Sequence, residues 1–142
     1  MEREIKFRAK EANTNRWVFG DLIQYENGDT AIFENKMTEY GCEATQICRR
    51  TKVQFDTIGQ YTGLQDKNGK DIYEGDILMC IRDRSDNKGK KYYRSVLFKH
   101  GSFCMTVPGY NCLSSLYNHV VNGKLLWEIV GNIYDNKDLL ED

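Results

Sequence analysis

The sequence predicts a mostly β protein, in the range from all-β to α+β, made of two related small SH3-like or barrel-type units packed together. Glycine, and not proline, marks the expected turns, since the chain has 12 glycines and a single proline, Pro108. Short runs of aromatic and β-branched residues alternate with polar ones, as half-buried strands do. A glycine-marked motif also occurs twice. We therefore expect β units over residues 1–63 and 64–142 that together form one compact domain.

The first unit should begin with a meander of strands. Residues 4–10 alternate polar and apolar side chains, residues 17–25 carry a second strand, and Asn27-Gly28 is a hairpin signal before a strand at 30–33. From residue 34 the pattern fades. Residues 44–49 fit either a strand or a helical turn, and both alternatives remain open at this stage.

The central stretch from Thr57 to Leu78 predicts two glycine-marked strands around a short turn. Asn68-Gly69 tolerates positive φ at both central positions of a type I′ turn, so we expect a hairpin or a compact loop here. Residues 72–81 then form a strand interrupted by Gly75, where a barrel strand could bend.

The second unit should carry insertions. Residues 82–91 are highly charged and predict a loop at a hairpin tip. Strands are expected at 92–99 and 102–107, joined at His100-Gly101. Near 113–122, apolar residues at helical spacing predict a short amphipathic helix that Gly123 ends. After the last strand, Asn136 can cap a short C-terminal helical turn.

An internal echo relates the two units. Two short motifs occur in both units. The first is Gly20-Asp21-Leu22-Ile23, which resembles Gly75-Asp76-Ile77-Leu78, and the second is Ile58-Gly59-Gln60-Tyr61, which resembles Val130-Gly131-Asn132-Ile133. Phe55 and Trp127 also occupy matching places, each four residues ahead of the second glycine. Such repetition predicts that each unit opens on a Gly-Asp strand and closes on an aromatic-led strand.

Three blocks of sequence carry a family resemblance. They are Ile5-Lys6-Phe7-Arg8-Ala9, the central run from Ile58 to Ile77, and the run from Trp127 to Asn136. In these blocks the chain strongly resembles the YopX family of phage and prophage proteins. The resemblance implies a mostly-β, oligomeric protein encoded by a bacteriophage or prophage, and it implies no established activity.

Composition narrows the class of protein. The 20 basic and 21 acidic residues give a formal charge of −1, so the whole-molecule basic character of many nucleic-acid binders is missing. No apolar run approaches the roughly 18 residues of a membrane span, and no secretory leader is evident. We expect no membrane association and a location in the bacterial host cytosol, where the five cysteines would be reduced thiols.

No motif indicates catalysis, a metal or a cofactor. His100, Cys104, Cys112 and His119 lack the close cysteine pair of a zinc site. No glycine loop has the sequence of a nucleotide-binding site. Glu74 and Asp76 would share a strand face and so leave a small hydrolase as a minor alternative. We expect a protein that is not an enzyme and holds no cofactor.

The sequence therefore favours a non-enzymatic binding or assembly module that forms a homo-oligomer. Its binding or interface surface is expected at seven residues of the central stretch: Gln60, Tyr61, Lys67, Asn68, Tyr73, Glu74 and Asp76. The alternative is a nucleic-acid-binding accessory factor in phage replication or regulation. Its contacts would lie on and beside the charged loop, at Arg82, Arg84, Lys88, Lys90, Lys91 and Tyr92. Another phage or host protein is a further expected partner.

Overall fold

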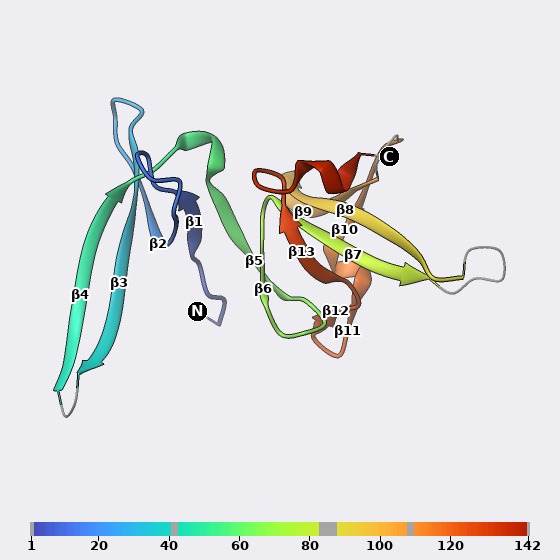
Figure 1. Cartoon of the computed structure of the whole chain (residues 1–142), viewed down its shortest axis with the longest axis horizontal. Coiled ribbons are helices and arrows are strands. Elements are labelled where there is room, and N and C mark those ends of the chain that lie inside the picture. The colour runs from blue at the N-terminus through green and yellow to red at the C-terminus, as the bar shows by residue number, and fades with distance from the viewer. Residues whose placement is uncertain (1, 41–42, 83–87, 108–109, 142) are drawn as a thin grey trace. The chain divides into compact units, whose positions relative to one another are not determined.

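The structure is a computed structural model that describes residues 2–40, 43–82, 88–107 and 110–141, with side chains left aside at 35–40, 43–47, 82, 107 and 110–112. The chain divides into two compact units, Met1–Tyr61 and Thr62–Asp142, where the sequence placed the boundary after residue 63. The described residues form strands joined by turns and short 3₁₀ segments (Figure 1). The prediction of a mostly β protein is confirmed.

Unit 1 is a four-strand meander followed by a closing strand. Its elements in chain order are β1 (Phe7–Lys10), β2 (Trp17–Gln24), β3 (Thr30–Tyr40), β4 (Glu43–Lys52), the 3₁₀ turn η1 (Phe55–Thr57) and the start of β5 (Gly59–Gln65). The strand order is β5-β1-β2-β3-β4, and Gln60 of β5 pairs with Phe7 of β1. One face of these strands buries Ala9, Val18, Ile32 and Val53 as the core of the unit.

Unit 2 repeats this topology. A meander of β7 (Asp76–Arg82), β8 (Lys90–Lys99), β9 (Ser102–Val107) and β10 (Tyr110–Ser115) is followed by the closing strand β13 (Glu128–Asn132), and the order is β10-β9-β8-β7-β13. In both units the last strand returns to pair antiparallel with the first. The expectation of two related β units is therefore confirmed at the level of topology.

Shorter elements complete unit 2. They are β6 (Asp71–Tyr73), which pairs with β5, the 3₁₀ turn η2 (Leu116–His119), the hairpin strands β11 (Val120–Val121) and β12 (Lys124–Leu125), and the C-terminal 3₁₀ turn η3 (Lys137–Leu140). The last of these is the helical turn expected after Asn136.

The internal echo is correct for the closing strands and wrong for the opening ones. Gly59 and Gly131 both lie in closing strands, β5 and β13. Gly75 precedes β7, the first strand of its meander, whereas Gly20 lies inside β2, the second strand of the other. Gly20 is needed there because a side chain would meet the backbone carbonyl of Phe33. The Gly-Asp pair therefore occupies different structural positions in the two units, and the structural reason for the glycine differs.

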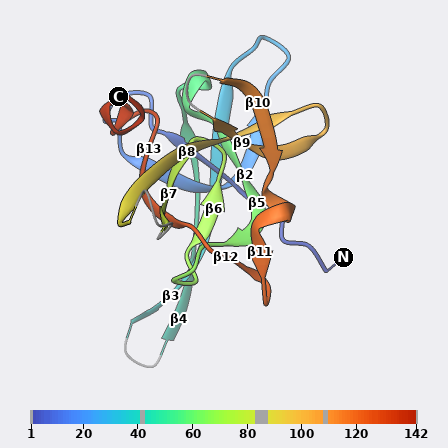
Figure 2. The same ribbon diagram turned by 90° about the vertical axis from the view of Figure 1, so that its right-hand side faces the viewer.

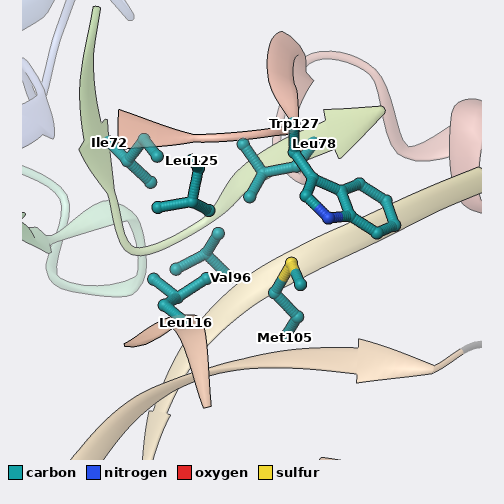
Figure 3. Packing of buried hydrophobic residues seen from close by; sticks show 7 residues of the cluster. All are labelled: Ile72, Leu78, Val96, Met105, Leu116, Leu125 and Trp127. Carbon is teal, nitrogen blue, oxygen red and sulfur yellow. The ribbon is translucent and has the colours of Figure 1, made fainter. Parts of the chain in front are cut away.

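The core of unit 2 joins distant segments. Ile72, Leu78, Val96, Met105, Leu116, Leu125 and Trp127 are all at most 3% exposed, and Figure 3 shows their side chains pointing toward one another from β6, β7, β8, β9, η2, β12 and the residue before β13. Burial of such side chains contributes about 1.5–3 kcal/mol each. The short strands β11 and β12 are thereby tied to the meander through Leu125.

The barrel expectation needs correction. Among the described residues both sheets are open paths of strands, and neither closes into a barrel. In unit 1 a single bridge between Glu11 and Val53 brings the end of β4 back to the end of β1. One bridge is not a ladder, so the architecture is that of open meanders.

The amphipathic helix predicted near 113–122 is wrong. The segment is the end of strand β10, the 3₁₀ turn η2 and strand β11. The reason lies in Val120, Val121 and the Asn122-Gly123 pair that follows. Asn122 has φ of 52° and Gly123 of 78°, which is a type I′ hairpin turn, and the adjoining β-branched residues prefer strands.

The turn at Asn68-Gly69 does not have the backbone geometry of a type I′ turn. Positive φ occurs at Gly69 but not at Asn68, and the amide of Gly69 donates to the carbonyl of Asp66 at 3.0 Å. The turn is therefore a longer loop with a glycine in the left-handed conformation, rather than type I′. The I′ geometry instead occurs at His100-Gly101, where both residues have positive φ and the predicted hairpin is confirmed.

Candidate functional site

The central turn is organised by Asp66, whose side chain is fully buried. Its Oδ1 accepts hydrogen bonds from the amides of Asn68 at 2.8 Å and Lys70 at 2.9 Å. Its Oδ2 accepts a third, at 3.0 Å, from the amide of Ile129 in β13. A carboxylate bonded in this way fixes the shape of the turn and attaches it to the closing strand of unit 2. Sequence reasoning treated Asp66 as a turn residue only.

Lys67 and Asn68 lie at the tip of this turn and contact the same carboxylate. Lys67 Nζ is 3.7 Å from Glu128 Oε2, and Asn68 Nδ2 donates to that oxygen at 3.3 Å. Both side chains are exposed, so the ion pair contributes at most about 1 kcal/mol. These two expected interface residues therefore have a partner within their own unit.

The residues around Gly75 are also used by the fold. Asp76 is 2% exposed, and its Oδ2 accepts a hydrogen bond from the amide of Tyr73 at 2.8 Å. Gly75, with φ of 89°, donates from its amide to Val96 and accepts from Ile133, both at 2.8 Å. Tyr73 is buried and Glu74 half-buried. Asp76 is thus engaged in a turn, which leaves little support for a Glu74–Asp76 acid–base pair.

Gln60 and Tyr61 belong to the other unit. Both lie in β5 where it pairs with β1, and the amide of Tyr61 donates to the carbonyl of Lys6 at 2.9 Å. Tyr61 is buried, and Lys6 Nζ lies 4.6 Å from the centre of its ring. The seven residues expected to form one surface are therefore divided between unit 1 and unit 2.

The residues of the nucleic-acid alternative are only partly described. Arg84 and the side chain of Arg82 lie outside the described residues. Lys88, Lys90 and Lys91 are exposed, and Lys90 Nζ is 5.3 Å from the ring centre of Tyr92. The ring of Tyr92 packs against the core of unit 2, so it is held as a core aromatic more than as an open stacking platform.

A long hairpin in unit 1 was not anticipated. Strand β3 pairs with β2 over residues 30–33 only, yet it pairs with β4 from Ala31–Lys52 out to Tyr40–Glu43 (Figure 1). The outer part of this ribbon, residues 34–40 and 43–49, is named here the arm. A second view of the chain also shows the two strands running on together (Figure 2). The described residues place no third strand beside the arm. The open choice at 44–49 is resolved as strand.

A cluster of charges lies at the base of the arm. Glu11 accepts a hydrogen bond from the hydroxyl of Thr14 at 2.7 Å and from Arg16 Nε at 3.3 Å, and its other oxygen is 3.6 Å from Arg49 Nη2. The Thr14 hydrogen bond, with the two arginines, lowers the pKa of the Glu11 carboxyl below its ordinary value. Arg49 also approaches Glu34 at 4.0 Å.

Two classes of site find no support in the described part of the chain. No three histidine, cysteine, aspartate or glutamate side chains converge there as metal ligands, and the side chain of Cys112 is outside it. His119, one of the four residues considered and rejected as zinc ligands, bonds Ser114 Oγ through Nε2 at 2.9 Å and packs in a T-shaped arrangement with Trp127. In the same residues no helix has the length and apolar character needed to cross a membrane.

Comparisons with known proteins complete these observations. A sequence model of the family described as "YopX protein" matches residues 6–141. No curated protein matches. Among solved structures, the chain is similar to the crystal structure of protein EF1440 from Enterococcus faecalis, with a TM-score of 0.64 and 20% identity over 99% of this chain and 100% of that one. At this identity the likeness shows the fold alone.

Proposed function

The chain belongs to the YopX family, and from this premise we propose that it is a non-enzymatic binding or assembly module that forms a homo-oligomer through the arm. As in the family resemblance, the protein would be encoded by a phage or prophage and act in the cytosol of the bacterial host. The single observation that carries the proposal is the length of the β3–β4 ribbon beyond the last pair with β2.

A ribbon of two strands is a weak structure by itself. An isolated hairpin is marginally stable in water, and a third strand or a packed face is needed for independent stability. In unit 1 the arm has pairs from Glu34–Arg49 to Tyr40–Glu43 with no third strand beside it among the described residues. Another surface must therefore supply the missing pairing if the arm is to remain ordered.

A second copy of the chain fits this requirement well. Strand β4 ends the strand order of its sheet, and its outer edge carries backbone donors and acceptors from Glu43 toward Lys52, whose carbonyl already accepts from the amide of Ala12. Antiparallel pairing of β4 with β4 of another copy is self-complementary, as a two-fold interface demands. Such pairing adds a third strand to each arm and covers the β4 edge of both copies.

The mass of the protein in solution tests this proposal. The intact chain, with a monomer mass of 16.6 kDa, should scatter light as a dimer at micromolar concentration. In a shortened variant, Asn-Gly replaces residues 35–48 and directly joins the paired residues Glu34 and Arg49. Hydrogen-bonded and non-hydrogen-bonded pairs alternate along an antiparallel ladder, so Glu34–Arg49 is of the same type as the native terminal pair Tyr40–Glu43 and can accept the same two-residue turn. This shortened variant should be monomeric.

A matched control shortens a different hairpin. Asn-Gly in place of residues 83–89 joins the paired residues Arg82 and Lys90 and leaves the arm intact, so that variant should remain dimeric. A strictly monomeric intact chain up to near-millimolar concentration would contradict the proposal. A shortened-arm variant that is still dimeric would show that another surface forms the oligomer.

A further inference from the structure

The side of the unit 1 sheet away from its core gathers cations and aromatic rings. Lys6, just before β1, and Arg8 and Lys10 within it recur at every second residue and so lie on one side, while Ala9 on the other side is fully buried. Arg8 itself is only 8% exposed. Arg8 lies opposite Phe19 of β2, and Lys10 lies opposite Trp17. Residues directly opposite in an antiparallel pair point to the same side. This side is named here the cationic face.

The cationic face continues across the sheet to β4. Phe33 pairs with Asp21 on one side and with Arg50 on the other, and Ala31 pairs with Lys52. The register therefore adds two cations, Arg50 and Lys52, to the three of β1. The register also places one acidic residue, Asp21, among these five cations. The cationic face therefore has a net positive charge, whereas the whole chain has a formal charge of −1.

Rings and cations on this face are in direct contact. The Arg8 guanidinium lies 4.8 Å and Lys10 Nζ 5.5 Å from the ring centre of Trp17. The guanidinium of Arg50 lies 5.9 Å from the ring centre of Tyr25. Phe19 and Tyr25 are 43% and 39% exposed, so part of each ring is open to solvent beside these cations.

Nearby carboxylates reduce the charge at the margins of the cationic face. Glu4 is 3.2 Å from Lys6 Nζ, and Asp29 is 4.0 Å from Lys52 Nζ. Both carboxylates are well exposed, so the two ion pairs are weak and open to exchange with another anion.

We propose that the cationic face binds single-stranded nucleic acid. The cations at residues 6, 8 and 10 are roughly 6.6 Å apart along the chain, a regular spacing suited to a phosphate backbone. The buried Arg8 adds positive charge beneath the surface, and the more open Lys10, Arg50 and Lys52 offer the contacts. Exposed Phe19 and Tyr25 can stack on unpaired bases, which a duplex does not present. An acidic peptide would match the charges but leave the rings without planar partners. This inference does not depend on oligomer formation.

Anisotropy of labelled oligothymidylate and oligouridylate, titrated with the full chain over a range of salt, tests the proposal. Binding should weaken as the salt concentration rises. The oligonucleotide that binds with the higher affinity identifies DNA or RNA as the preferred ligand. Replacing Lys10, Arg50 and Lys52 by glutamine should reduce the slope of log affinity against log salt by about 2, since each phosphate contact on a single strand contributes about 0.7. Phe19→Ala should weaken binding roughly five-fold or more while keeping the salt slope.

The charged loop of unit 2 provides a control of equal charge change. Glutamine at Lys88, Lys90 and Lys91 should leave the affinity and the slope unchanged. Loss of binding in this loop variant alone, or equally in both variants, would overturn the proposal. No binding at low salt, or equal binding of duplex, polyglutamate or anionic vesicles, would do so too. Circular dichroism and light scattering on each variant separate these outcomes from unfolding and from loss of the dimer.

Discussion

Removal of the Asp66 carboxylate should destabilise unit 2 strongly. Its side chain is fully buried and accepts three backbone hydrogen bonds, two inside the turn and one from Ile129 in β13. Asp66→Ala removes all three acceptors. Asp66→Asn keeps one oxygen, which can serve either the two turn amides or Ile129 but not both, because the new amide group is itself a donor.

The size of the loss follows from where the three amides lie. The amide of Ile129 is half-buried, so leaving it without an acceptor costs about 1–3 kcal/mol. The amides of Asn68 and Lys70 belong to exposed residues that water can reach, and each lost bond there costs about 0.5–1.5 kcal/mol. The free energy of unfolding should therefore fall by about 2–6 kcal/mol for Asp66→Ala and by about 1–3 kcal/mol for Asp66→Asn.

Urea unfolding followed by circular dichroism measures these losses as shifts of the midpoint at constant slope. Asp135→Asn is the control, because Asp135 is an exposed aspartate of the same unit whose Oδ2 accepts a hydrogen bond from Asn132 Nδ2 at the surface. This control should change stability by less than about 0.5 kcal/mol. If Asp66→Ala behaved like the control, the carboxylate would not be what joins the turn to β13.

Two further predictions concern the pH dependence of unit 1 and the core of unit 2. Because the folded pKa of Glu11 is lowered, its stabilising effect is complete above the ordinary value of 4.5 and is lost as pH falls below it through the folded pKa. Urea unfolding between neutral pH and pH 3 should show a smaller acid destabilisation in Glu11→Gln than in the parent, and parallel curves would contradict the assignment. Leu125→Ala should lower the unfolding free energy by about 2–5 kcal/mol, whereas Leu126→Ala, at a residue 60% exposed, should change it by less than about 0.5 kcal/mol. Equal losses at the two leucines would show that β12 is not packed into the core.

Local patterns in the sequence were sufficient for the strands of the meanders. The alternation at Phe7–Lys10 and the apolar run at Trp17–Gln24 predicted β1 and β2, and Gly59 and Gly131 correctly matched the two closing strands. The helix near 113–122 failed because apolar residues at helical spacing also fit two short strands around a turn. The Asn122-Gly123 pair, which favours a type I′ turn, is the feature of the sequence that separates these two alternatives.

The roles of the acidic residues could not be deduced from sequence. Asp66 and Ile129 are 63 positions apart, so nothing near Asp66 indicates that its carboxylate would be buried against β13. Lys67, Asn68 and Asp76 were predicted as interface residues because they stand out in the central stretch. The structure gives each of them an intramolecular partner.

The cationic face was within reach of sequence analysis. Lys6, Arg8 and Lys10 alternate with apolar residues in the very pattern that predicted β1, and Trp17 opens the next strand. The nucleic-acid hypothesis was based instead on the charged loop at 82–91, because the cations of that loop lie close together in the sequence. Cations on one face of a strand are separated in sequence and are brought together only by the pairing of β1 with β2 and of β3 with β4.

Hydrogen exchange of the arm tests the central claim most directly. Amides of a two-stranded ribbon open easily, whereas those of a ribbon paired with a second copy are protected by the stability of the dimer. Peptides covering residues 34–49 should exchange slowly at high protein concentration and markedly faster on dilution, while peptides from β7 and β8 keep their rates. Fast exchange in the arm at every concentration would contradict an assembly formed through β4.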